Sequence, residues 1–95
     1  MTRPRKCCRI WFCPEYDCFT PEGKAQADLE VIEVTPEEAE SLRLKNIKDL
    51  DQTEAAARMG ISQSTFQRIL SSAYKKVSEA LIYGKAIKIQ KRDEN

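Results

Sequence analysis

The sequence predicts a mainly α-helical fold: a three-helix domain containing a helix-turn-helix, with short flanking β-strands and an irregular cysteine-rich N-terminal segment. Three N-cap signals, at Thr35, Asp51 and Ser62, each precede a run of helix-forming residues, and Gly60 and Gly84 stand where two of these runs stop. The 95 residues suffice for one compact domain, and a content of 41% hydrophobic and 33% charged residues is typical of a globular chain.

The chain divides into three regions on the basis of these signals. We expect a Cys/Pro-rich arm over residues 1–34, the helical domain over 35–84, and a short strand with a frayed tail over 85–95. The prolines of the arm exclude a long helix there.

Short strands are expected on either side of the helices. A short extended piece is predicted near Arg9–Phe12, and the β-branched cluster in Leu29–Val34 predicts a strand. Ala86–Gln90 alternates as a strand does, and it could pair with Leu29–Val34 or with a second chain.

The first helix has the clearest start. Thr35, Pro36 and Glu38 occupy the N-cap, first and third helical positions, which is a capping box, and we expect this helix to end near Asn46 to Lys48. The second helix is expected to run from Asp51 as N-cap to Met59, with Gly60 after it. The third is expected to run from Ser62 as N-cap to Gly84, with one apolar stripe along its length.

The second and third predicted helices fit the pattern of a helix-turn-helix. Such a unit needs a small residue where the helices cross, a flexible residue in the turn and apolar residues facing inward. In this chain these positions are filled by Ala56, Gly60, Met59, Ile61, Phe66 and Ile69.

If Phe66 and Ile69 point inward, polar side chains lie on the opposite face of the third helix. Gln, Ser and Arg suit the base edges of the major groove, so the candidates for base reading are Gln63, Ser64, Gln67 and Arg68. The candidates for phosphate contacts are Arg58, Ser62, Thr65, Ser71, Lys75 and Lys76.

The distribution of charge favours a polyanionic partner. Residues 28–57 carry nine acids and three bases, whereas residues 58–92 carry eight bases and one acid, although the whole chain has a net charge of only +1. The alternative is an ordinary helical hairpin with a solvated face, but such a face usually mixes charges of both signs.

The first 18 residues hold a basic arm and all four cysteines. Arg3, Arg5, Lys6 and Arg9 could lie in a minor groove, or they could form a charged terminus with no such role. The cysteines, which could bind zinc or an iron–sulfur cluster or be free thiols, are Cys7, Cys8, Cys13 and Cys18. Their spacing departs from common zinc motifs, so we expect free or buried thiols and no cofactor.

Several segments carry a resemblance to known families. The stretch from Val34 to Gly84, with TPEEAESLRL, AAARMGIS and a long basic helix, resembles region four of sigma-70-type factors, except that Asp49 stands where those sequences often have Gly. PRKCCRI, VTPEEAESLRL, KDLDQTEAAARMGIS, QSTFQRILSSAYKKVSEAL and YGKAIKI together resemble the prokaryotic domain-of-unknown-function 134 family. This resemblance implies a helix-turn-helix DNA-binding protein.

The leading hypothesis is a transcriptional regulator that binds double-stranded DNA as a homodimer, in contact through Val77, Leu81, Tyr83 and the Ala86–Gln90 strand. The alternatives are a sigma-like module that docks on transcription machinery, and a regulator that responds to metal or redox state through Cys7–Cys18.

The sequence argues against other classes. Histidine is absent and the three glycines are scattered, so neither an enzyme nor a small-molecule substrate is expected. The lack of a long apolar run or a secretory signal predicts a cytoplasmic location with no membrane partner.

Overall fold

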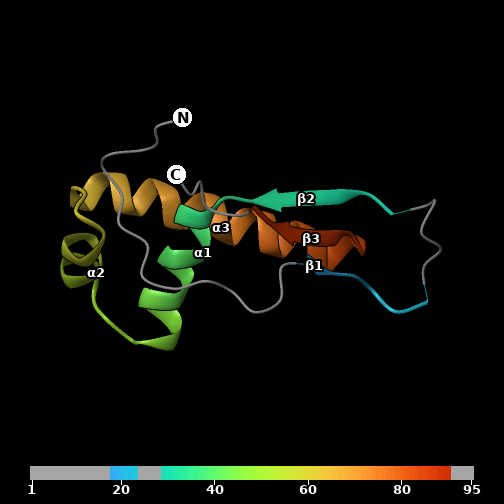
Figure 1. The fold of residues 1–95 in the computed structure, drawn as a ribbon, viewed down its shortest axis with the longest axis horizontal. Coiled ribbons are helices and arrows are strands. Elements are labelled where there is room, and N and C mark those ends of the chain that lie inside the picture. Colours follow the sequence, from blue (N-terminus) through green and yellow to red (C-terminus); the bar gives the residue numbers. More distant parts are fainter. Residues whose placement is uncertain (1–17, 24–28, 91–95) are drawn as a thin grey trace.

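The protein is mainly α-helical with a small sheet, as predicted. A computed structural model describes residues 18–23 and 29–90, and the predicted extended piece at Arg9–Phe12 lies outside these ranges. The elements in chain order are β1 (Cys18–Phe19), β2 (Val31–Val34), α1 (Pro36–Leu42), the π-helical segment η2 (Arg43–Ile47), α2 (Gln52–Met59), α3 (Gln63–Tyr83) and β3 (Ala86–Ile89). In Figure 1 α1 and α2 pack near the N-terminal half of α3, and the sheet runs along its C-terminal half. No helix in the described residues is long and apolar enough to cross a membrane.

The first helix begins with the predicted capping box. The Glu38 amide donates to Thr35 Oγ1 at 3.1 Å, and the Thr35 amide donates to Glu38 Oε1 at 2.9 Å. Two N–H groups that have no partner inside a helix are thereby satisfied. The helical path ends near the predicted residues, but its last turn is π-helical, with the Lys48 amide bonded to the Arg43 carbonyl at 2.9 Å.

The turn after η2 depends on a left-handed residue. Asp49 has φ of 64°, in the region that glycine adopts most easily and that Asn and Asp tolerate better than other residues do. Asp49 is the residue that departs from the sigma-like pattern, and its backbone takes the conformation for which a glycine would be suited.

Helices α2 and α3 are joined by a turn of three residues. Gly60 ends α2 with φ of 71°, and its amide bonds the Ala57 carbonyl at 3.0 Å. Ser62 then caps α3, since its hydroxyl accepts from the Thr65 amide at 3.1 Å. The predicted stop and start signals are therefore confirmed at both residues.

One apolar core lies between η2, α2 and α3. Its fully buried members are Leu44, Ala55, Ala56, Met59, Phe66 and Leu70, with Leu42, Leu50 and Ile61 packed against them. The inward positions predicted for Ala56, Met59 and Phe66 are confirmed. Ile69 is only partly buried.

The sheet joins distant parts of the chain around β3. β3 pairs in parallel with β2, Val31 opposite Ala86, and antiparallel with β1, Phe19 opposite Ile87. Of the two predicted pairings for the last strand, the one within the chain is therefore correct. The strand β2 begins at Val31, two residues later than predicted, and β1 was not predicted because it lies in the segment expected to be irregular.

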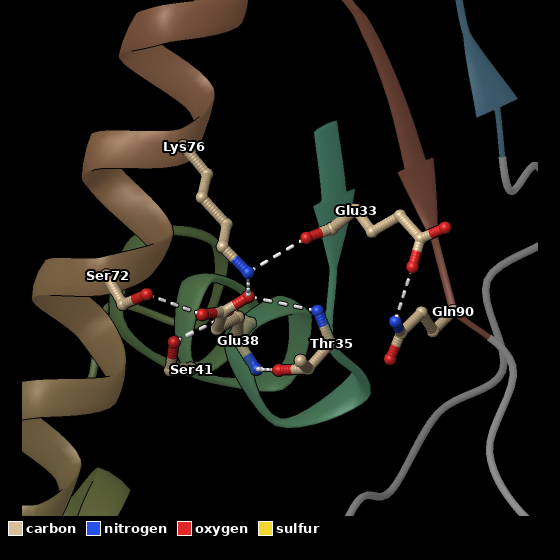
Figure 2. Close-up of polar contacts among 7 residues, drawn as sticks. All are labelled: Glu33, Thr35, Glu38, Ser41, Ser72, Lys76 and Gln90. Atoms are coloured by element: carbon tan, nitrogen blue, oxygen red, sulfur yellow. Dashed lines mark hydrogen bonds and ion pairs between the residues drawn. The ribbon is translucent and has the colours of Figure 1, made fainter. Parts of the chain in front are cut away.

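A buried carboxylate ties the sheet and two helices together, as Figure 2 shows. Glu38 Oε2 accepts from Ser72 Oγ at 2.6 Å, and its Oε1 accepts from Lys76 Nζ at 2.9 Å. The same ammonium donates to the Glu33 carbonyl of β2 at 2.8 Å. Burial raises the pKa of Glu38, but the hydrogen bonds from Ser72, Lys76 and Thr35 outweigh it, so the pKa lies below its ordinary value.

Replacing Gly60 with alanine should destabilise the fold by about 1–2 kcal/mol, because a Cβ disfavours its left-handed conformation. Urea unfolding followed by circular dichroism would measure the loss. Asp49→Gly is the matched control, since glycine adopts the same backbone region, and we expect a change of less than about 0.5 kcal/mol. Equal losses for the two variants would contradict this account of the turns.

Removing the charge of Glu38 should weaken the fold in a pH-dependent way. Because its folded-state pKa is lowered, its contribution is fully present above its unfolded pKa of about 4.3 and is lost as the pH falls through the folded value. Glu38→Gln should therefore cost about 1.5–3 kcal/mol at pH 7 and progressively less in acid. The exposed Glu54→Gln serves as a control with a change of less than about 0.5 kcal/mol at either pH. A Glu38→Gln loss that is the same at pH 3 and pH 7 would refute the ionic role.

Candidate nucleic-acid interface

The first turns of α3 present a polar face opposite the core. Its exposed side chains are those of Gln63, Ser64, Gln67, Arg68 and Ser71, which we call the α3 polar face. Phe66 and Leu70, on the other side of the same turns, are buried. The four residues predicted for base reading thus lie together on one exposed surface.

Hydrogen bonds order part of this face. Gln67 Nε2 donates to Ser71 Oγ at 3.3 Å, and Gln67 Oε1 accepts a hydrogen bond from Gln52 Nε2. Gln52 is the first residue of α2, so this contact crosses between two helices. Sequence reasoning missed Gln52, because the sequence alone does not show which residue of α3 lies opposite the start of α2.

Two of the predicted cationic residues remain available to a ligand. Arg68 and Lys75 are exposed, and neither forms an ion pair within residues 18–23 and 29–90. Arg58, on α2, lies 3.7 Å from the Glu54 carboxylate, and both side chains are about half exposed. Such an exposed pair contributes little to stability.

Two of the predicted phosphate-binding hydroxyls, those of Ser62 and Thr65, take part in the cap of α3. Ser62 Oγ accepts from the Thr65 amide and donates to Thr65 Oγ1 at 2.9 Å, and it lies 3.3 Å from Ser64 Oγ. The cap thus fixes the positions of three hydroxyl groups at the start of the α3 polar face.

Lys76, one of the predicted phosphate contacts, forms an ion pair within the fold. Its side chain is 31% exposed and its ammonium bonds both Glu38 and the Glu33 carbonyl. Ser72 and Lys76 are four residues apart, so both lie on the side of α3 that faces α1 and β2. Lys75 points to solvent instead. The sequence could not separate these neighbouring lysines because it does not show which acid lies opposite.

The basic stretch of the sequence is partly neutralised by ion pairs within the chain. Lys85 Nζ lies 2.7 Å from Glu79 Oε2 and 3.1 Å from Glu30 Oε1, and the hydrogen bond to Glu79, followed by that to Glu30, raises the pKa of Lys85. The same contact lowers the pKa of Glu79. The charge excess counted over residues 58–92 therefore overstates the free positive charge of the surface.

The C-terminal end of α3 exposes large apolar side chains. Leu81, Ile82 and Tyr83 are 75%, 75% and 67% exposed. Leu81 and Tyr83 were predicted for a dimer contact and are accessible, whereas Val77 is half-buried and β3 has a strand on each side.

The remaining predicted site residues lie mostly outside the described ranges. These are Arg3, Arg5, Lys6 and Arg9 of the basic arm and the cysteines Cys7, Cys8 and Cys13. Cys18 is an exposed free thiol in β1, opposite Lys88. Among the residues that the structure covers, no three potential ligands gather to hold a metal ion.

The fold and its exposed face define a small, mainly α-helical protein with a polar surface on its longest helix. The chain belongs to the family described as protein of unknown function DUF134, whose sequence profile matches residues 1–94. This match confirms the resemblance to the domain-of-unknown-function 134 family that the sequence indicated.

Its relatives are bacterial proteins named UPF0251. One from Desulforudis audaxviator is 47% identical over 90 residues, covering 95% of this chain and 59% of the relative. Those from Clostridium novyi and Clostridium beijerinckii are 48% and 49% identical, covering 98% and 94% of this chain and 63% and 60% of the relatives. The chain thus spans about three-fifths of the length of these relatives. No solved structure matches it.

Substitution of the adjacent residues Lys75 and Lys76 should show that only the second contributes to the stability of the fold. Lys76→Met leaves Glu38 with an unpaired buried charge and should cost about 1.5–3 kcal/mol of stability in urea unfolding. Lys75→Met, at an exposed position, should change stability by less than about 0.5 kcal/mol. Comparable losses for the two would show that the Lys76–Glu38 contact contributes nothing specific.

Proposed function

We propose that this protein binds double-stranded DNA and regulates transcription, with α2 and α3 acting as a helix-turn-helix. The single observation that carries the proposal is the α3 polar face: five exposed residues of types that hydrogen-bond to base edges, on the first turns of a 21-residue helix. A helix of this kind fits the width of the major groove.

The proposed roles of the residues in DNA binding follow from the exposure of each side chain. The bases are contacted by Gln63, Ser64, Gln67 and Arg68. Arg68 suits guanine, which an arginine can contact with two hydrogen bonds, and its guanidinium has no partner in the described residues. Arg58, Lys75 and the hydroxyls of Ser62, Thr65 and Ser71 contact the phosphates and fix the register of α3 on the duplex. The site of action would be the cytoplasm, where bacterial DNA lies.

The exposed apolar end of α3 favours a second candidate, a module that docks on another protein. Three consecutive large apolar residues that are at least two-thirds exposed are typical of surfaces that contact proteins. The same residues would serve a homodimer on DNA. The two candidates differ in salt dependence: a DNA-binding protein binds random duplex at about 50 mM salt and releases it steeply toward about 200 mM, whereas a docking module does not bind at either.

Two alanine variants test the proposal on a selected duplex and on random duplex. Arg68→Ala should lose about 1–3 kcal/mol on the selected site and much less on random DNA, because it removes base recognition. Lys75→Ala should weaken both duplexes alike and reduce the slope of log K against log salt by about 0.9. Fluorescence anisotropy across a salt series measures both quantities. Equal effects of Arg68→Ala on the two duplexes would exclude base reading by Arg68.

A further inference from the structure

We infer that Gln52 determines the base preference of the α3 polar face by holding the Gln67 amide in one orientation, and that the base so preferred is adenine. This inference rests on the proposed DNA binding. It concerns a residue of α2 that lies outside the predicted base-reading set.

The contacts of Gln67 fix which end of its amide faces which neighbour. Its Oε1 accepts from Gln52 Nε2, and its Nε2 donates to Ser71 Oγ at 3.3 Å. Ser71 lies one turn further along the same helix, whereas Gln52 belongs to a different helix, so the amide is held from two sides. A free glutamine on a helix surface would turn between its two amide orientations.

The two contacts leave half of the amide's hydrogen-bonding capacity unused. A glutamine oxygen accepts two hydrogen bonds and its nitrogen donates two. Gln52 occupies one lone pair and Ser71 takes one hydrogen, so one acceptor and one donor remain side by side. Gln67 is exposed, which leaves both accessible to a ligand on the α3 polar face.

Adenine offers the matching pair in the major groove. Its N7 accepts and its N6 amino group donates, and glutamine can satisfy both at once. Guanine presents two acceptors at the corresponding positions and would leave the Gln67 oxygen facing another acceptor. A fixed amide therefore selects adenine more sharply than a rotating one, because no orientational freedom is lost on binding.

The role of Gln52 can be separated from a general effect on affinity by changing the direction of its hydrogen bond. Gln52→Lys keeps a donor toward Gln67 Oε1 and preserves the amide orientation. Gln52→Glu provides only acceptors, so the amide must turn its Nε2 toward residue 52, with the Ser71 hydroxyl then donating to Oε1. The outward donor and acceptor exchange places in the second variant only.

The unmodified protein is first used to select duplexes from a random library. The selection is repeated with Gln67→Ala, and the base pair whose preference is lost is the one that Gln67 contacts. Binding is then measured to four duplexes that differ only at that pair. We expect adenine to be preferred by roughly 5- to 150-fold, the range for one bidentate contact. Gln52→Lys should retain this ratio, and Gln52→Ala and Gln52→Glu should reduce it severalfold or more. Because the ratio compares duplexes of equal charge, the charge change at residue 52 cancels.

Gln90→Ala is the matched control, since it also removes an exposed glutamine hydrogen bond, the one of 2.7 Å to Glu33, beside the sheet and away from residues 52 and 67 in the hydrogen-bond network. It should keep the full adenine preference. Thermal melting by circular dichroism confirms that each variant is folded. A preferred base other than adenine, no position sensitive to Gln67→Ala, or an unchanged ratio in Gln52→Glu would overturn the inference. Failure of the unmodified protein to bind random duplex at about 50 mM salt would instead overturn the proposed function.

Discussion

The buried carboxylate of Glu38 is the contact on which the relative placement of the elements depends. It closes the capping box of α1, accepts from Ser72 on α3 and pairs with Lys76, whose ammonium also holds the backbone of β2. A charge in this position is costly unless it is hydrogen-bonded, and here the Thr35 amide and two side chains of α3 donate to it. The apolar core of η2, α2 and α3 lies at one end of α3. Glu38 connects the helices around this core to the sheet.

The structure uses its charges in two ways. Lys76 pairs with the buried Glu38 and Lys85 pairs with the more exposed Glu30 and Glu79, whereas Arg68 and Lys75 of α3 face solvent. Because an ion pair with a buried partner holds its lysine in place, Glu38 fixes Lys76, whereas the outer cations Arg68 and Lys75 stay accessible to a ligand. Two exposed cations, Arg68 and Lys75, therefore lie on the same helix as the other exposed polar side chains of α3.

The sequence was informative where local chemistry decides the structure. The caps at Thr35, Asp51 and Ser62 and the stop at Gly60 depend on side chains within four residues of one another, and all appear as predicted. The π-helical turn of η2 and the strand β1 were not predicted, because they depend on packing and on a partner strand far along the chain. The exposed set on α3 follows from helical periodicity alone, but the contact from Gln52 and the ion pair of Lys76 with Glu38 depend on which element lies opposite. Contacts between side chains that are far apart in the chain produce no periodic pattern in a single sequence.

The central place of β3 in the sheet has a consequence for the order in which the chain can fold. β1 and β2 do not pair with each other, and each meets β3 across roughly 55 to 70 residues of intervening sequence. During synthesis the two early strands must leave the ribosome and remain without their hydrogen-bonding partner until Ala86–Ile89 has followed. The helices can meanwhile assemble from contacts that are closer in sequence. The sheet is thus the last part of the described fold to become complete, and it can form only after translation has passed residue 89.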